Sequence, residues 1–264
     1  MIGTPLFENL LGLVVLASFI PVTLGVARLV QRRPPGTLHS VAGRLRWRWF
    51  AVCGCLAVVV AVLAIGALTL VYDDGAELRV ADDPWRFLGL TVLLIVLVPL
   101  QAAGEEYATR GFLLQALGAY HRWVGILGSA LAFTLMHGLG TWPGFVALFV
   151  GAIIWAVLVI RTGGLEVSIA AHAATNLFAF VATAATGGLD VVDDTTAADA
   201  PLGVTLILLG GDLTYMACVI AALHLVARHR PQWMPGNRMA VAVAADAPQH
   251  PPQATADEDA NSRR

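Results

Sequence analysis

Apolar residues gather in long stretches that short polar segments separate. Seven stretches are long enough to predict helices that cross a membrane, because such a helix needs about 20 mainly apolar residues. They are residues 6–30, 49–72, 87–108, 124–141, 143–160, 165–186 and 201–227. The pattern therefore predicts an all-α fold, a polytopic membrane helix bundle of about seven transmembrane helices.

The polar segments between these stretches alternate in charge. Residues 31–48 contain arginines and no acidic residue, whereas residues 73–83 are mainly acidic and residues 187–200 hold four aspartates and no basic residue. Because cytoplasmic loops are enriched in basic residues, this alternation predicts an external N-terminus and a cytoplasmic C-terminus. We expect a multi-pass integral protein of the plasma membrane.

Composition supports the same class. Of 264 residues, 58% are hydrophobic and 13% are charged, and the mean hydropathy is +0.74. A soluble domain would carry about 25% charged residues, so a soluble globular protein is excluded.

The net charge of −2 and the lack of a basic domain argue against nucleic-acid binding. The three cysteines show no metal-binding spacing.

The last residues differ in composition from the rest of the chain. Residues 245–264 are rich in proline and charged residues and have no apolar period. We therefore expect residues 1–244 to form one membrane domain and residues 245–264 to form a disordered cytoplasmic tail.

Strongly polar side chains interrupt four of the apolar stretches. The interruptions read GEEYATRG, FTLMHG, HAATN and GGDLTY. Ionisable residues at membrane depth are costly and mark candidate functional sites.

The first interruption contains two adjacent glutamates with different surroundings. Glu106 and Arg110 are four residues apart, so they share a helical face and can form an ion pair. Glu105 lies about 100° around the helix and has no such partner. We expect it to point into a cavity, where it could act as a general base. Alternatively, both glutamates lie at the membrane interface, at the cytoplasmic end of this helix.

The second and third interruptions place histidines at helical spacing. Phe133 and His137 are four residues apart, as are His172 and Asn176. Polar groups inside a bundle must find one another, so we expect these side chains and Glu105 to converge. Alternatively, each histidine is only a hydrogen-bonding partner in helix packing.

The fourth interruption contains Asp212, which follows two glycines in the last apolar stretch. This aspartate either bonds a neighbouring helix or lines the same cavity. No motif gives it a catalytic role, so a structural role is the preferred interpretation.

Three motifs in this order resemble the signature of the CAAX-protease and bacteriocin-processing family, which includes the type II CAAX prenyl proteases. The motifs are Glu105-Glu106-x-x-x-Arg110, Phe133-x-x-x-His137 and His172-x-x-x-Asn176. The resemblance covers about residues 87–186, the expected catalytic core. It implies an intramembrane endopeptidase that hydrolyses a peptide bond with a glutamate-activated water, in a cavity open to the cytoplasm.

The resemblance also implies a role for each motif residue. Glu105 would activate the water with the help of His137. His172 and Asn176 would donate hydrogen bonds to the oxyanion of the tetrahedral intermediate. The residues that support this site would be Glu106, Arg110 and Phe133.

We expect no cofactor, with zinc as the alternative. Glu105, His137 and His172 are side chains of the kinds that bind zinc, but an HExxH motif is absent. The expected partners are a peptide or protein substrate, with or without a lipid modification, and membrane lipids.

The depths of the site residues raise a geometric problem. With a rise of about 1.5 Å per residue, Glu105 lies nearer the cytoplasmic surface than His137 and His172. Either the third helix tilts and continues unbroken through Gly111 and Phe112, or the stretch 124–141 begins in a cytoplasmic dip.

Two other functions compete with a peptidase. One is a non-catalytic membrane scaffold or bacteriocin-immunity protein. The other is a proton-coupled transporter, since acidic residues and histidines in a bundle also form ion pathways. Such transporters usually show repeats or broken helices in both halves, and neither feature is evident in this sequence.

Overall fold

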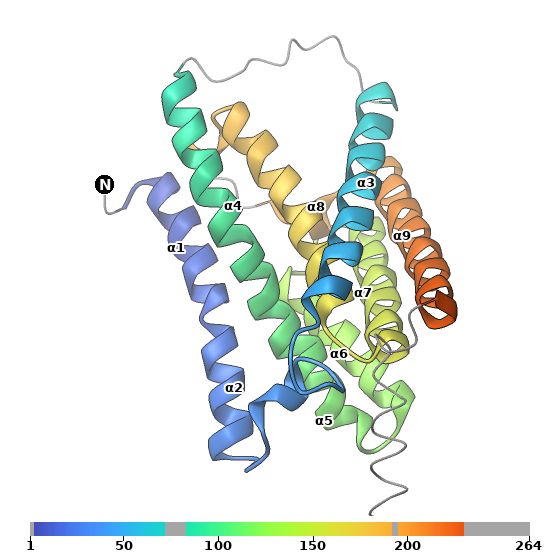
Figure 1. The fold of residues 1–264 in the computed structure, drawn as a ribbon. Coiled ribbons are helices and arrows are strands. Elements are labelled where there is room, and N and C mark those ends of the chain that lie inside the picture. Colours follow the sequence, from blue (N-terminus) through green and yellow to red (C-terminus); the bar gives the residue numbers. More distant parts are fainter. Residues whose placement is uncertain (1–2, 72–82, 192–194, 230–264) are drawn as a thin grey trace, which may run out of the picture.

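The computed structural model is a bundle of helices (Figure 1). It describes residues 3–71, 83–191 and 195–229, so the predicted tail, residues 245–264, lies outside the described residues. The prediction of an all-α polytopic membrane bundle is confirmed. Its α-helices are α1 (Pro5–Ala17), α2 (Phe19–Leu29), α3 (Trp47–Val71), α4 (Pro84–Glu106), α5 (Leu114–Gly118), α6 (Arg122–Met136), α7 (Trp142–Thr162), α8 (Glu166–Ala185) and α9 (Leu202–His229). Short helices are η1 (Pro35–Leu38), η2 (Tyr107–Leu113), η3 (Gly188–Asp190) and η4 (Ala197–Asp199).

Six helical segments of the described chain are long and apolar enough to cross a membrane. They are Pro5–Leu29, Trp47–Val71, Pro84–Gly118, Trp142–Thr162, Glu166–Ala185 and Leu202–Val226. The other predicted span, 124–141, corresponds to α6, which has 15 residues. At about 1.5 Å per residue it reaches roughly 22 Å, less than the roughly 30 Å of the hydrocarbon layer. Helix α6 is therefore an apolar helix that is shorter than a full span.

The third span is much longer than the predicted 87–108. Helices α4, η2 and α5 follow one another without a break from Pro84 to Gly118, a run of 35 residues. This is the first of the two arrangements expected from the depth argument. Segment η2 is a π-helix, a form that occurs mainly as short insertions, often near functional sites. Glu105 and Glu106 thus lie inside a long helix and are 4% and 0% exposed, so both carboxylates are buried within the protein.

The first span is interrupted at Ser18, between α1 and α2. Pro21 lacks the N–H that would bond the carbonyl of Ala17, and a proline ring also crowds that carbonyl. The interruption lies against α4, because a Cβ placed on Gly104 would come within 2.0 Å of the carbonyl oxygen of Leu16. Only glycine allows the two backbones to approach this closely.

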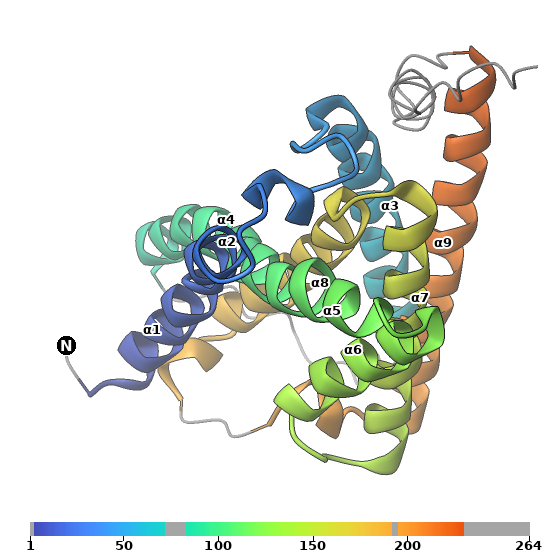
Figure 2. The same cartoon turned by 90° about the horizontal axis from the view of Figure 1, so that it is seen from below.

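Helix α8 occupies the middle of the bundle (Figures 1 and 2). It packs against α3, α4 and α7, while α9 covers α3 and α7, and α6 packs on α7. Helices α1 and α2 lie on the outer side of α4 (Figure 1). The central position of α8 brings its polar residues within reach of the glutamates on α4.

The arginine-rich segment before α3 is fixed to the start of α8. Arg46 binds the fully buried carboxylate of Glu166 with Nε (2.9 Å) and Nη2 (2.7 Å). The backbone N–H of Leu165 donates to the carbonyl oxygen of His39, and the His39 ring is hydrogen-bonded to the hydroxyl of Tyr107. These contacts connect the segment with the two helices that carry the candidate site.

Candidate functional site

The carboxylate of Glu106 joins α4 to η2 and α8. Its Oε1 accepts hydrogen bonds from Arg110 Nη1 (2.9 Å) and from His172 Nδ1 (3.0 Å). The expected ion pair with Arg110 is therefore present, and both partners are fully buried. The guanidinium carbon of Arg110 lies 4.1 Å from the ring centroid of Phe133. Burial of the Glu106 charge is thus offset by a cation and by a second hydrogen-bond donor.

The contact with Glu106 fixes the orientation of His172. An ionised carboxylate can only accept hydrogen bonds, so the proton of the contact belongs to Nδ1 of His172. The other ring nitrogen, Nε2, lies 3.8 Å from Oε2 of Glu105. This separation is too long for a direct hydrogen bond.

Glu105 is held by a residue that the sequence motifs do not contain. Its Oε1 accepts a hydrogen bond from Gln101 Nε2 (2.5 Å), while its Oε2 is buried and has no hydrogen-bond partner in the described structure. The amide oxygen of Gln101 accepts a hydrogen bond from Asn176 Nδ2 (3.2 Å). Gln101 is 3% exposed and connects the carboxylate on α4 to the amide on α8.

Among the expected site residues, His137 directly contacts Phe133. It ends α6, and its Nδ1 donates to the carbonyl oxygen of Phe133 (3.0 Å). The Phe133 ring centroid lies 4.7 Å from that of His137 and 5.6 Å from that of His172. Among the described contacts there is no hydrogen bond between His137 and Glu105. Glu105, His172 and Asn176 thus lie close together around Gln101, whereas His137 meets only Phe133 of the expected set.

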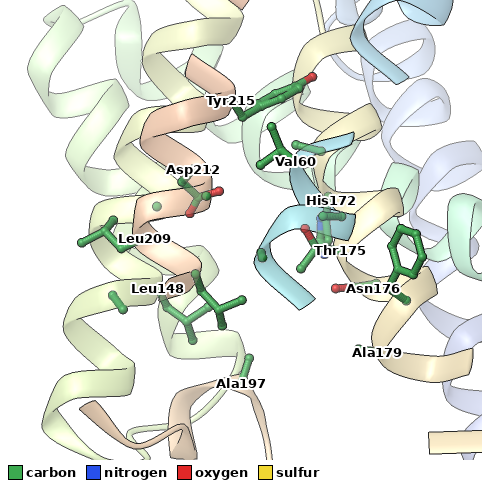
Figure 3. A pocket seen from close by; sticks show the side chains of 18 of the residues that line it. Val60, Leu148, His172, Thr175, Asn176, Ala179, Ala197, Leu209, Asp212 and Tyr215 are labelled. Carbon is green, nitrogen blue, oxygen red and sulfur yellow. The ribbon is translucent and has the colours of Figure 1, made fainter. Parts of the chain in front are cut away.

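A cavity of about 500 Å³ adjoins these residues. Its wall is mostly apolar and comes from α3, α6, α7, α8, η4 and α9; its polar members are His137, His172, Thr175, Asn176, Thr205 and Asp212. Figure 3 shows His172, Thr175 and Asn176 on α8 at one side and Asp212 and Leu209 on α9 at the other. Glu105 does not line the cavity. Its carboxylate lies within the protein, 3.8 Å from the ring of His172, which does line the cavity.

The cavity occupies one end of the bundle. Its wall uses the later part of α3, the end of α6 and the first halves of α7 and α9. It also includes Ala197, in the connection that follows α8. The charge pattern of the loops predicts that this end faces outside. The opening to the cytoplasm that the family resemblance implies stays a prediction.

Besides Gln101, the site includes Trp155 and Asp212, which the motifs do not contain. The indole Nε1 of Trp155 donates to Oδ1 of Asp212 (2.9 Å), and its ring centroid lies 5.3 Å from that of His172. Both interpretations of Asp212 hold at once, because it bonds a neighbouring helix and also lines the cavity. The sequence does contain a signal for Gln101: it precedes Glu105 by four residues, so the two side chains share a helical face.

The three side chains expected to bind zinc, those of Glu105, His137 and His172, do not lie together. In the described ranges, no group of three or more His, Cys, Asp or Glu side chains is arranged to hold a metal ion. Glu105 and His172 are close to each other, but His137 lies beyond Phe133.

Fold and site together define a class: a multi-pass helical membrane protein with a buried cluster of glutamate, glutamine, histidine and asparagine beside an apolar cavity. Residues 84–178 match the family model described as type II CAAX prenyl endopeptidase Rce1-like. This range contains all three motifs, so the resemblance inferred from the motifs is confirmed. At the level of the family, the match supports an intramembrane protease of the CAAX type.

A curated relative is similar to this chain over a longer range. The uncharacterized protein YyaK of Bacillus subtilis (strain 168) is 29% identical over 187 residues, which are 67% of this chain and 62% of that protein. The chain therefore spans less than two thirds of the relative's length. No solved structure matches this chain significantly.

Proposed function

We propose that this protein is an intramembrane endopeptidase in which Glu105 activates the attacking water. One observation carries the proposal: the partnerless Oε2 of Glu105 lies 3.8 Å from Nε2 of His172, beside a cavity. Both atoms are hydrogen-bond acceptors when Nδ1 carries the histidine proton. A single water at ordinary hydrogen-bond distance from both atoms can bridge this gap. Its two protons would point at the acceptors, and its lone pairs would be free to attack.

The proposed reaction is a simple hydrolysis. The water oxygen adds to the carbonyl carbon of the peptide bond while Glu105 accepts one proton. Glu105 then returns the proton to the leaving nitrogen as the C–N bond breaks. The products are a carboxylic acid and an amine, and the carboxylate of Glu105 is regenerated.

Asn176 is the proposed donor to the oxyanion. One N–H of its amide is directed to Gln101, and the other remains available on the cavity wall. The hydrogen bond to Glu106 favours a water-binding role for His172 over the oxyanion role implied by the family resemblance. His137 would contact the substrate from the opposite side of Phe133.

The proposed substrate is a peptide or protein segment, with or without a lipid modification. The mostly apolar wall of the cavity supports an apolar segment presented within the membrane. Membrane lipids would surround the outer faces of the spans, and the proposed location is the plasma membrane.

The test is cleavage of a quenched-fluorescent peptide library by the full chain in detergent. Glu105→Gln preserves shape but removes the base, so we expect cleavage to fall by a factor on the order of 10²–10⁴. The matched control is Glu8→Gln, the same change at an exposed carboxylate of α1, which should cleave like wild type. Activity should persist in a chelator.

Three results would count against the proposal. Full activity of Glu105→Gln would remove the proposed base. Loss of activity in a chelator, restored by zinc, would replace the mechanism by a metal-dependent one. No cleavage by folded wild-type protein, together with Glu105-dependent proton flux in proteoliposomes, would favour the transporter.

A further inference from the structure

The carboxylate of Asp212 lies on the cavity wall, opposite the polar face of α8 (Figure 3). Its Oδ1 is fixed by the indole N–H of Trp155 at 2.9 Å. Trp155 is 8% exposed and its ring also packs against His172. The carboxylate is thus held in one orientation, separated from the proposed reactive groups by one indole ring.

The second carboxylate oxygen of Asp212, Oδ2, lies against Gly151 of α7, where any larger residue would crowd it. A Cβ placed on Gly151 would lie 2.7 Å from Oδ2 of Asp212, closer than a side-chain carbon normally approaches. The glycine therefore lets α7 pass beside the carboxylate. No hydrogen-bond donor to Oδ2 is present among the described residues.

The charges around the cavity do not balance. Among the described residues that line the cavity, only Asp212 carries a carboxylate. The guanidinium of Arg110, 5.6 Å from the Trp155 ring, already pairs with Glu106. In the part of the chain that the structure describes, Asp212 has no ion-pair partner, and none of the described residues lining the cavity is lysine or arginine. A carboxylate without an ion-pair partner at membrane depth is costly. A cation that enters the cavity would reduce this cost.

We propose that Asp212 is a binding site for the side chain of a lysine or arginine in the peptide substrate. The inference rests on the proposed function, since it names a substrate feature recognised beside the same site. Leu148, Leu209 and Val60 lie near Asp212 on the cavity wall (Figure 3). They offer an apolar surface for the methylene stem of such a side chain, while its charged end meets the carboxylate.

The position of Asp212 also limits where the cationic residue stands in the substrate. The ring centroid of Trp155, which bonds Asp212, is 5.3 Å from that of His172. Because a single side chain separates Asp212 from His172, the lysine or arginine stands near the cleaved bond.

The experiment measures binding without cleavage. Fluorescein-labelled short apolar peptides, identical except for lysine or norleucine at one scanned position, are titrated by anisotropy against the full chain carrying Glu105→Gln, in detergent. We expect the lysine peptide to bind at least about tenfold more tightly, which corresponds to about 1.4 kcal/mol.

Two variants and a control test the carboxylate. Asp212→Asn keeps an acceptor for Trp155 but removes the charge, so the ratio of the two affinities should fall to about one. Gly151→Ala should lower the ratio by displacing Oδ2. The control is Gly211→Ala on the same cavity wall, where the new methyl group would meet Val60 Cγ1 at an ordinary 3.7 Å, so the ratio should not change.

The outcomes separate this inference from the proposed function. The inference is overturned if no scanned position shows a preference for lysine, if the preference survives in Asp212→Asn, or if that variant weakens both peptides equally. Charge-selective binding without Glu105-dependent cleavage would support the cation site at Asp212 and reject the peptidase. Glu105-dependent cleavage without charge-selective binding would support the peptidase and reject the cation site.

Discussion

At the scale of single residues, two adjacent glutamates differ because their partners differ. Glu106 is bound by Arg110 and His172, so its charge is compensated. Glu105 receives one hydrogen bond, from Gln101, and its second oxygen has no partner in the described structure. The first arrangement is suited to holding helices together, and the second leaves an acceptor available for water.

Gln101 should be a positioning residue, since it bonds Glu105 and Asn176 and does not line the cavity. Gln101→Leu removes both hydrogen bonds, so kcat should fall by a factor on the order of 10–10² with KM nearly unchanged, because misplaced reactive groups lose rate. Gln101→Glu restores an acceptor for Asn176 and, when protonated, a donor to Glu105. Its activity should therefore recover at lower pH, a signature that a packing defect would not give.

The control for this prediction is Gln115→Leu, the same change at an exposed glutamine farther along the same helical run. It should retain wild-type kcat. Equal losses of kcat in both variants, or a pH profile for Gln101→Glu that parallels wild type, would refute the positioning role.

At the scale of elements, a glycine contact and a proline interruption set how α1 and α2 pack on the glutamate-bearing helix. The end of α1 approaches Gly104, the residue directly before Glu105. Pro21 accounts for the interruption of the helix at Ser18, which lies beside this contact. The outermost helices thereby constrain the backbone at the site.

Gly104→Ala should destabilise the protein by about 1–3 kcal/mol, because the added methyl group overlaps the Leu16 carbonyl and forces the helices apart. Unfolding in detergent, followed by circular dichroism, measures the change. The control is Gly89→Ala on α4, where a Cβ meets no atom within 4 Å. That variant should be neutral or more stable by up to about 1 kcal/mol. Equal stabilities of the two variants would contradict the close approach.

At the scale of the whole molecule, the polar segment before α3 ties distant parts of the bundle together. Arg46 holds Glu166 at the start of α8, and His39 contacts Tyr107 on η2. The two helices that supply the candidate base and its histidine are thus clamped at one end by a segment that lies outside the spans.

This clamp should make stability depend on pH. Burial lowers the pKa of His39 below its usual 6.5, against a smaller opposing effect of Glu166. Below pH 6.5 His39 is therefore protonated more in the unfolded chain than in the folded one. The contribution of His39 to the free energy of unfolding should be fully retained above that pH and should decrease as the pH falls toward the lowered pKa.

The measurement is the unfolding midpoint from about pH 8 to about pH 5 for wild type and His39→Gln, which keeps a hydrogen-bonding group near Tyr107. The difference between the two midpoints should be constant at high pH and change below pH 6.5. A difference that stays constant over the whole range would show that His39 does not titrate with folding.

The sequence by itself determined the class, most of the spans and the composition of the site. Apolar runs specify spans because a bilayer requires about 20 apolar residues per helix. The Glu106–Arg110 pair follows from helical spacing alone. The same spacing rule predicts the contact between Gln101 and Glu105. A neutral glutamine costs less in an apolar run than a charge does, so it is a weaker signal of a functional site.

Only the tertiary structure decided how these parts meet. The contacts between Glu106 and His172, and between Gln101 and Asn176, join residues 66 and 75 positions apart. Spacing along the chain carries no information on such distances, on which nitrogen of His172 faces Glu105, or on the separation of His137 from it. The cavity and the carboxylate of Asp212 on its wall likewise arise from the packing of separate helices. Helical periodicity sets the face a side chain occupies, but the partner it meets there depends on how whole helices tilt and pack.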